Sequence, residues 1–258
     1  MQGKISQAST FIDSHCHYHP TISFPEFFSA TSNNIKACID NSSSCIAICL
    51  VEMEATDWFS ELTSHAGTPS FDVQTKDENT LLVTVNEVEV SVFRARQINS
   101  LERIEVIIVG CAKEIPSGLP LDDYLKDYGK DYLVILPWGV GKWLGERGAL
   151  VRQKINGNSM IVLGDNGGRP KVWTNIPAFG LAHKYNIPIL AGSDPLPIKN
   201  HLFRSGAYGN IIEGKIDTCS AWISCVKNMN KTPKLYGSLS STFRFLMDQI
   251  KLRLAKYI

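Results

Sequence analysis

The sequence predicts an α/β protein, a distorted TIM-like barrel of seven to eight (β/α) units with an inserted β-hairpin. Short apolar runs alternate with helical patterns along the whole chain, and several runs, such as residues 46–51, are apolar at every position. Strands that are apolar on both faces are typical of a parallel sheet covered by helices. The alternation therefore predicts βα units wound right-handed into a barrel or an open sheet.

The predicted elements follow in order. The strands cover residues 10–15, 45–51, 104–110, 133–136, 160–164 and 187–191. The helices cover residues 25–39, 56–65, 121–128, 146–155 and 177–185. A last amphipathic helix is predicted over 240–258, because apolar residues recur there at spacings of three and four: Phe243, Leu246, Ile250, Leu254 and Tyr257. We expect this stripe to pack on the core, with a dimer contact as the alternative.

One segment departs from the βα rhythm. Residues 80–85 and 88–93 alternate in polarity around Asn86-Glu87, which predicts a β-hairpin near residues 79–98. The hairpin is either an added flap beside the barrel rim or a detour of the main sheet. No linker or repeat divides the chain, so we expect a single domain over residues 1–258.

Composition is that of an ordinary globular protein. The chain has 258 residues, 44% hydrophobic and 20% charged, enough for a sizeable core. A net charge of +1 does not favour a general electrostatic grip on nucleic acid, although a local basic patch stays open. There is no apolar signal segment and no run near ~18 apolar residues, so we expect a cytoplasmic protein without a membrane partner. The seven cysteines include no CxxC pair, and the oligomeric state is left open.

Two histidines near the N-terminus indicate a metal site. His15 and His17 are one residue apart, so on a strand both imidazoles point to the same side and can close on one cation. Neutral imidazole binds zinc, manganese or iron, and its second nitrogen needs an orienting partner, for which Asp13 is the candidate. The alternative is a strand end that carries three surface histidines, with His19 as the third.

A second polar strand end lies far along the chain. The apolar run that begins at Ile189 ends in Asp194, followed by a loop that contains Pro195 and Pro197. In barrels and open parallel sheets the carboxyl ends of the strands converge on one site. We therefore expect Asp194 to meet the histidine pair as a metal ligand or general base. The alternative is that Asp194 caps a turn before Pro195.

These two motifs resemble those of a known superfamily. Residues 11–17 resemble the opening HxH motif of amidohydrolase-type metal-dependent hydrolases, especially TatD-type deoxyribonucleases and PHP-type phosphoesterases. Residues 192–195 are similar to their late aspartate motif. The resemblance implies a (β/α) barrel, one to three divalent cations, and hydrolysis by an activated water. It also implies that His15, His17 and Asp194 bind metal, with Asp194 a candidate acceptor of the water's proton.

The middle motifs of these families are not recognisable here. Only His65, His183 and His201 remain to supply further imidazoles, and of these His201, in a loop after Asp194, could reach the rim. A reduced, a carboxylate-rich and a lost metal site all stay open.

Other strand ends carry polar groups suited to an anion. Lys142 and Arg147 follow one predicted strand, and Asp165, Asn166 and Arg169 follow the next. Lysine and arginine bind phosphate oxygens, although a carbamylated Lys142 that bridges metals and a simple turn around Arg169 are alternatives. Glu52 ends the second strand as a further possible ligand, with a charge at a helix N-terminus as the equal alternative.

The sequence thus predicts a metal-dependent hydrolase of a small anionic or phosphorylated substrate, most simply a phosphoester. The predicted cofactor is a divalent zinc, manganese or iron ion, and its candidate ligands are His15, His17, Asp194, Asp165 and Glu52. The predicted catalytic residues are Asp194, Lys142 and Arg169. The predicted substrate-binding residues are Lys142, Arg147, Arg169, Asn166 and His201. The alternatives are hydrolysis of an amide or lactone, or a binding barrel without catalysis whose metal site is degenerate.

Overall fold

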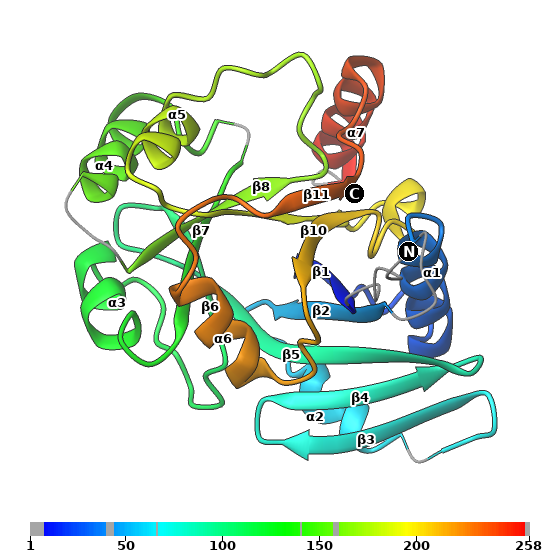
Figure 1. The fold of residues 1–258 in the computed structure, drawn as a ribbon. Coiled ribbons are helices and arrows are strands. Elements are labelled where there is room, and N and C mark those ends of the chain that lie inside the picture. Colours follow the sequence, from blue (N-terminus) through cyan, green and yellow to red (C-terminus); the bar gives the residue numbers. More distant parts are fainter. Residues whose placement is uncertain (1–7, 40–43, 66, 140, 157–159, 256–258) are drawn as a thin grey trace, which may run out of the picture.

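A barrel-shaped sheet organises the protein. The computed structural model describes residues 8–39, 44–65, 67–139, 141–156 and 160–255. Their sheet is nearly closed, and helices surround it (Figure 1). In spatial order its strands are β11 (Lys234–Gly237), β10 (Tyr208–Glu213), β1 (Ser9–Cys16), β2 (Cys45–Glu52), β5 (Val88–Asn99), β6 (Glu105–Val109), β7 (Leu133–Pro137), β8 (Ile161–Asn166) and β9 (Ile189–Gly192).

Five of the helices in the described residues, the first five along the chain, pack in two groups against this sheet. Their bounds are α1 (Phe24–Lys36), α2 (Trp58–Thr63), α3 (Leu121–Tyr128), α4 (Gly145–Ile155), α5 (Pro177–Lys184), α6 (Cys219–Lys227) and α7 (Thr242–Ala255), with a 3₁₀ turn at Lys199–His201. One apolar cluster joins α3, α4 and α5 to β6, β7, β8 and β9, and another joins α1 and α2 to β1, β2, β4 and β5. No helix in the described part of the chain has both the length and the apolar character to cross a bilayer.

Strand direction corrects the uniform (β/α) pattern. β1, β2 and β5 are parallel, and so are β7, β8 and β9, but β6 is antiparallel to both of its neighbours and β10 is antiparallel to β1. The connection between β5 and β6 is a tight turn in which the Arg103 amide donates to the Ser100 carbonyl. So short a connection joins antiparallel strands, because a parallel crossover needs about a dozen residues. The result is a mixed α/β barrel-shaped sheet.

The predicted hairpin is part of that sheet. β4 (Thr80–Val85) pairs with β5 through a turn in which Asn86 and Glu87 have φ of 47° and 63°. Positive φ at both positions is the type I′ geometry that matches strand twist. β5 then continues to Asn99 and pairs in parallel with β2, so the segment is a detour of the main sheet. A further strand, β3 (Phe71–Asp77), extends the hairpin and is largely exposed, so it has no apolar run to reveal it.

The last third of the chain closes the barrel against β1. A side chain at Gly192 would collide with the backbone of His15, so only glycine allows this approach. The Asp13 carboxylate, fully buried, accepts from the amides of Ser193 (2.9 Å) and Gly206 (2.9 Å) and from the Ser193 hydroxyl. Asp13 also accepts from the His15 amide and touches neither imidazole, which corrects its predicted role as orienting partner. Burial raises the pKa of Asp13 to about 6 although these donors lower it.

Apolar side chains fill the barrel interior. A continuous cluster takes residues from every strand between β10 and β9 around the barrel, and α6 adds Trp222, which is fully buried. In contrast, α7 buries only Phe245 and Asp248 deeply, while Phe243 is 75% exposed and Leu254 is 60% exposed. This corrects the expectation that the stripe on the last helix packs on the core. Tyr257 lies outside the described residues, and a dimer contact stays a prediction.

Candidate metal centre

The end of β1 brings His15 and His17 together. His15 lies within the strand and His17 directly follows its last residue. Their Nε2 atoms are 2.9 Å apart, and both side chains are at least nine-tenths buried. The i, i+2 spacing on an extended segment therefore turns both rings to one side, as the sequence predicts.

A backbone carbonyl fixes the tautomer of His17. Its Nδ1 lies 2.7 Å from the carbonyl oxygen of Val51 on β2. A carbonyl can only accept, so Nδ1 carries the proton and the Nε2 lone pair of the neutral ring faces His15. Burial lowers the pKa of His17 to about 4 and also lowers that of His15. Both rings are thus neutral near pH 7, which is the form that binds metal.

Asp194 completes a cluster of three donors. Its Oδ1 lies 3.7 Å from Nε2 of His15 and 3.6 Å from Nε2 of His17. Asp194 has a left-handed φ of 43°, held because its amide donates to the His15 carbonyl at 2.8 Å. Burial raises the pKa of its carboxyl, but the two imidazoles in their protonated form, the Lys142 ammonium and the Asn166 hydrogen bond more than offset burial and hold that pKa below its usual value.

The spacing of these donors fits a single cation. Three ligands on a tetrahedral ion with bonds of about 2.1 Å lie about 3.4 Å apart. The three separations here are 2.9, 3.6 and 3.7 Å. Two neutral imidazoles and an ionised carboxylate suit zinc, manganese or iron. The hydrogen bond from His17 to Val51 is the type of outer contact that orients a ligating histidine.

Two clefts meet at this cluster. One, of about 470 Å³, is lined by the two histidines together with Gln97, Glu105 and Lys142. The other, of about 580 Å³, is lined by Lys142 and Asp194 and by residues of α7, among them Phe245 and Leu252. A molecule in either cleft would reach Asp194 and Lys142, so the cluster is accessible to a substrate.

Three residues at the cluster are not predicted as site residues by the sequence. Glu105 forms an ion pair with Lys142, and the Gln97 side-chain oxygen is buried without a hydrogen-bond partner among the described residues. Glu105 begins β6, and it reaches this rim because β6 runs against its neighbours, a reversal that the apolar pattern does not encode. The carbonyl of Val51 leaves no trace in residue type at all.

The sequence matches no family profile and no curated protein at a significant level. The structure is similar to that of PsfC from Pseudomonas syringae PB-5123, with a TM-score of 0.59 and 16% identity over 96% of this chain and 98% of that one. It is also similar to the lesion-specific endonuclease PfuEndoQ from Pyrococcus furiosus, with a TM-score of 0.54 and 15% identity over 85% of this chain and 56% of that one. The chain shares their fold.

Asp165 and Arg169 lie apart from the cluster, in a buried ion pair. The guanidinium donates to both carboxylate oxygens at 2.7 Å, and the hydroxyl of Tyr208 donates to the same carboxylate at 2.8 Å. Arg169 also donates to the Trp173 carbonyl and is 8% exposed. This corrects Asp165 as a metal ligand and Arg169 as a substrate contact, because each already satisfies the other's charge.

Replacement of Arg169 by Lys is accordingly expected to affect stability. Lysine keeps the charge but loses the bidentate contact with Asp165, so the free energy of unfolding should fall by about 1–3 kcal/mol. Denaturant unfolding measures this change, and KM for any substrate should stay within about twofold because the contact lies away from the clefts. A variant of unchanged stability with a raised KM would instead restore Arg169 to the substrate.

Glu52 and Arg147 also have structural partners. Glu52 accepts from the Phe59 amide in the first turn of α2 (2.8 Å) and pairs with Arg96 (3.0 Å). Of the two alternatives for Glu52, the structure thus supports the helix N-terminal charge. Arg147 lies on α4 and donates to the Gly141 carbonyl at 2.8 Å, and it lines neither cleft. These contacts correct the prediction of Glu52 as a metal ligand and that of Arg147 as a substrate contact.

Asn166 and His201 support the centre indirectly. The Asn166 amide donates to Oδ2 of Asp194, and its oxygen accepts from the Gly168 amide at 2.6 Å. His201, fully buried, accepts from the Leu196 amide (3.2 Å) and faces Asp248 of α7 (2.7 Å). Both residues line the larger of the two clefts, but their present partners make them positioning residues for Asp194 and for the loop that follows it.

Loss of the Asn166 contact should weaken metal binding. In Asn166→Ala the Asp194 carboxylate loses the donor that orients it, and such outer contacts are worth about 10–100-fold in metal affinity. Competition with a chromogenic chelator measures this affinity. The matched control is Asn175→Ala, at an exposed position, which should bind metal as the parent does. Equal affinity in the two variants would show that Asn166 does not position Asp194.

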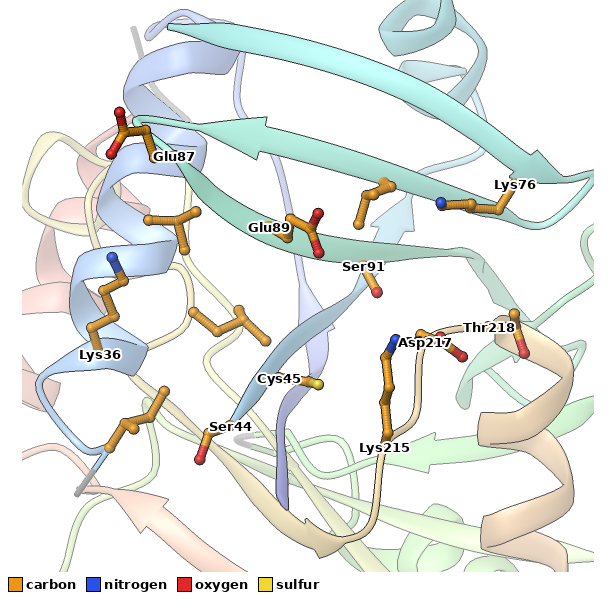
Figure 2. Close-up of a pocket in the computed structure, with 14 residues that line it drawn as sticks. Lys36, Ser44, Cys45, Lys76, Glu87, Glu89, Ser91, Lys215, Asp217 and Thr218 are labelled. Atoms are coloured by element: carbon orange, nitrogen blue, oxygen red, sulfur yellow. Dashed lines mark ion pairs between the residues drawn. The ribbon is translucent and has the colours of Figure 1, made fainter. Parts of the chain in front are cut away.

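A cleft larger than these two lies elsewhere. It has a volume of about 710 Å³ and is lined by the first residues of β2 and β5, at the amino ends of strands whose carboxyl ends face the histidines. Both lysines and carboxylates line it (Figure 2): Lys36, Lys76, Lys215, Glu87, Glu89 and Asp217. Lys215 pairs with Asp217 at 3.0 Å. Charges balance here and none of the lining residues is a histidine, so the histidine cluster remains the candidate site.

Proposed function

We propose that the chain is a metal-dependent hydrolase that acts on a phosphoester. The observation that carries this proposal is the triad of His15, His17 and Asp194, whose spacing fits one divalent ion at the junction of two clefts. The similarity of fold to a protein described as a lesion-specific endonuclease supports hydrolysis of a phosphodiester, and nucleic acid is thereby included among the substrates to be tested.

Each residue has a defined task in this proposal. His15, His17 and Asp194 hold the ion, which when bound would lower the pKa of a water towards ~7 and so supply the nucleophile. Lys142, held by Glu105, presents its ammonium to the cleft and neutralises charge on the phosphoryl oxygens. Asn166 keeps the Asp194 carboxylate in place.

A cationic group beside the donors favours a phosphoester over an amide. Lys142 is shared by both clefts, so an anionic group in either one meets it. Amide and lactone substrates develop one oxyanion and need less positive charge, which makes them the second choice. A binding barrel without catalysis remains the third hypothesis, and activity decides between them.

The test is a substrate screen with manganese or zinc added to the purified full chain. Phosphomonoesters, phosphodiesters, DNA with and without lesions, and simple amides are compared in the parent and in Asp194→Asn. We expect phosphoester cleavage that the variant lacks. Cleavage of amides alone would replace the phosphoester by the second hypothesis, and metal binding without any turnover would favour the third. Activity that persists in the variant would exclude this centre.

A further inference from the structure

A third cleft, of about 590 Å³, carries an unusual set of charges. Its charged lining residues are Lys171, Arg204 and Arg244, and none of the described residues around it is Asp or Glu. The three cations come from three segments: the loop after β8, the loop before β10, and α7. No ion pair joins any of them to a carboxylate of the described residues, whereas six other lysines and arginines there do pair with a carboxylate, as Lys154 does with Asp122.

Hydrogen bonds within the protein hold the two guanidinium groups in place. Arg204 is half-buried, and its guanidinium donates to the Gly167 carbonyl (3.3 Å) and the Ser240 hydroxyl (3.3 Å) and touches His201 (3.2 Å). Arg244 donates to the Asn200 carbonyl at 3.3 Å. Neutral acceptors fix both guanidinium groups, and neither group pairs directly with a carboxylate, although Asp248 and Asp194 lie near enough to raise the pKa of Arg204. Positive charge that is gathered and oriented in this way suits an anion.

Hydroxyl groups add donors of a second kind. Ser238 and Ser241 line the same cleft, as does Ser240, whose hydroxyl already donates to the Gly167 carbonyl at 3.2 Å. Burial and the nearby Arg244 lower the pKa of Arg204, so bringing an anion into the cleft would relieve the repulsion between the two guanidinium groups. Phosphate accepts hydrogen bonds on several oxygens at once and matches a lining of guanidinium, ammonium and hydroxyl donors.

We propose that the cleft between Lys171, Arg204 and Arg244 is a second site that binds a phosphate group. None of the three proposed metal ligands lines this cleft, so the site is distinct from the proposed metal centre, although the Asp194 carboxylate lies near enough to raise the pKa of Arg204. The phosphate comes either from a free anion or from the backbone of a polynucleotide, and the two sources share the same contacts.

The test measures binding of inorganic phosphate to the full chain by calorimetry. We expect Lys171→Ala with Arg244→Ala to weaken binding at least about tenfold, since two charge-assisted contacts are lost. Both side chains are exposed, so the variant should fold, which its thermal unfolding checks. The control removes the same charge elsewhere, with Lys126→Ala and Lys184→Ala, and should bind phosphate within about twofold of the parent.

Further arms locate and identify the ligand. The variant His15→Ala with His17→Ala should keep phosphate binding, whatever becomes of hydrolysis. Binding that is lost there, or weakened equally by the control pair, or unchanged by the Lys171 and Arg244 changes, would overturn the proposal. A single-stranded oligonucleotide that binds more tightly than phosphate and needs the same two cations would identify the backbone as the source. If phosphate alone needs them, the source is a free anion.

Discussion

A chain with both His15→Ala and His17→Ala is expected to retain no zinc or manganese after desalting, whereas the parent retains about one ion per chain. The two imidazoles supply two of the three donors, and a lone carboxylate holds such ions weakly. Turnover should fall by roughly 10³-fold or more, because a bound ion contributes several kcal/mol to the transition state. Elemental analysis and initial rates measure the two effects.

The control for this experiment is His183→Ala. His183 is exposed on α5, so its loss should change neither metal content nor rate. Circular dichroism should show that the double variant keeps its secondary structure. Metal retained by a folded double variant would contradict the assignment of the centre, and loss of metal without loss of phosphoesterase activity would separate that activity from the metal.

Replacement of Lys142 by Ala should lower turnover by about 10²-fold. A preorganised cation that meets charge in the transition state is typically worth that amount. The loss should appear in kcat, measured at saturating metal, because Lys142 is not one of the three proposed ligands. The change also leaves Glu105 without its cation, so the double variant Lys142→Ala with Glu105→Gln shows how much of the loss comes from the unpaired carboxylate.

Lys154→Ala is the matched control for Lys142. Lys154 also pairs with a carboxylate, that of Asp122, but it lines neither cleft of the candidate centre. Its loss should leave turnover within about twofold, since exposed ion pairs contribute little. An equal fall in both variants would indicate a general effect of charge and would remove Lys142 from the proposed reaction.

Much of the fold follows from local pattern. The apolar runs locate β1, β2, β6, β7, β8 and β9 to within a few residues. The helix predicted over 121–128 has the same bounds as α3. The direction of a strand does not follow from local pattern, because it depends on how the strand is connected and paired, as for β6 and β10. β10, with Gly209 and Asn210 in its centre, has too broken an apolar pattern to be recognised, and the exposed β3 and β11 have too little burial to leave one.

The candidate centre, too, could be predicted from the sequence only in part. Spacing places His15 and His17 on one side of a strand, and the rule that strand ends converge brings Asp194 to them, both from residue type alone. The failures at Asp165, Arg169 and Glu52 share a cause. A charged residue at a strand end looks the same in sequence whether it faces a substrate or a buried partner, and only the partner, such as Tyr208 or Arg96, distinguishes them.

The carboxylate of Asp13 has a consequence for the order in which the molecule assembles. It accepts hydrogen bonds from Ser193 and Gly206, which lie 180 and 193 positions further along the chain than Asp13. Closing so long a loop costs conformational entropy before any contact repays it, so pairings of this kind form late in folding. The donors of the candidate centre flank that junction, and they meet only once the last third of the chain has docked on the first strand. An ion that binds there would bind only the folded chain and would therefore stabilise the closed barrel against unfolding.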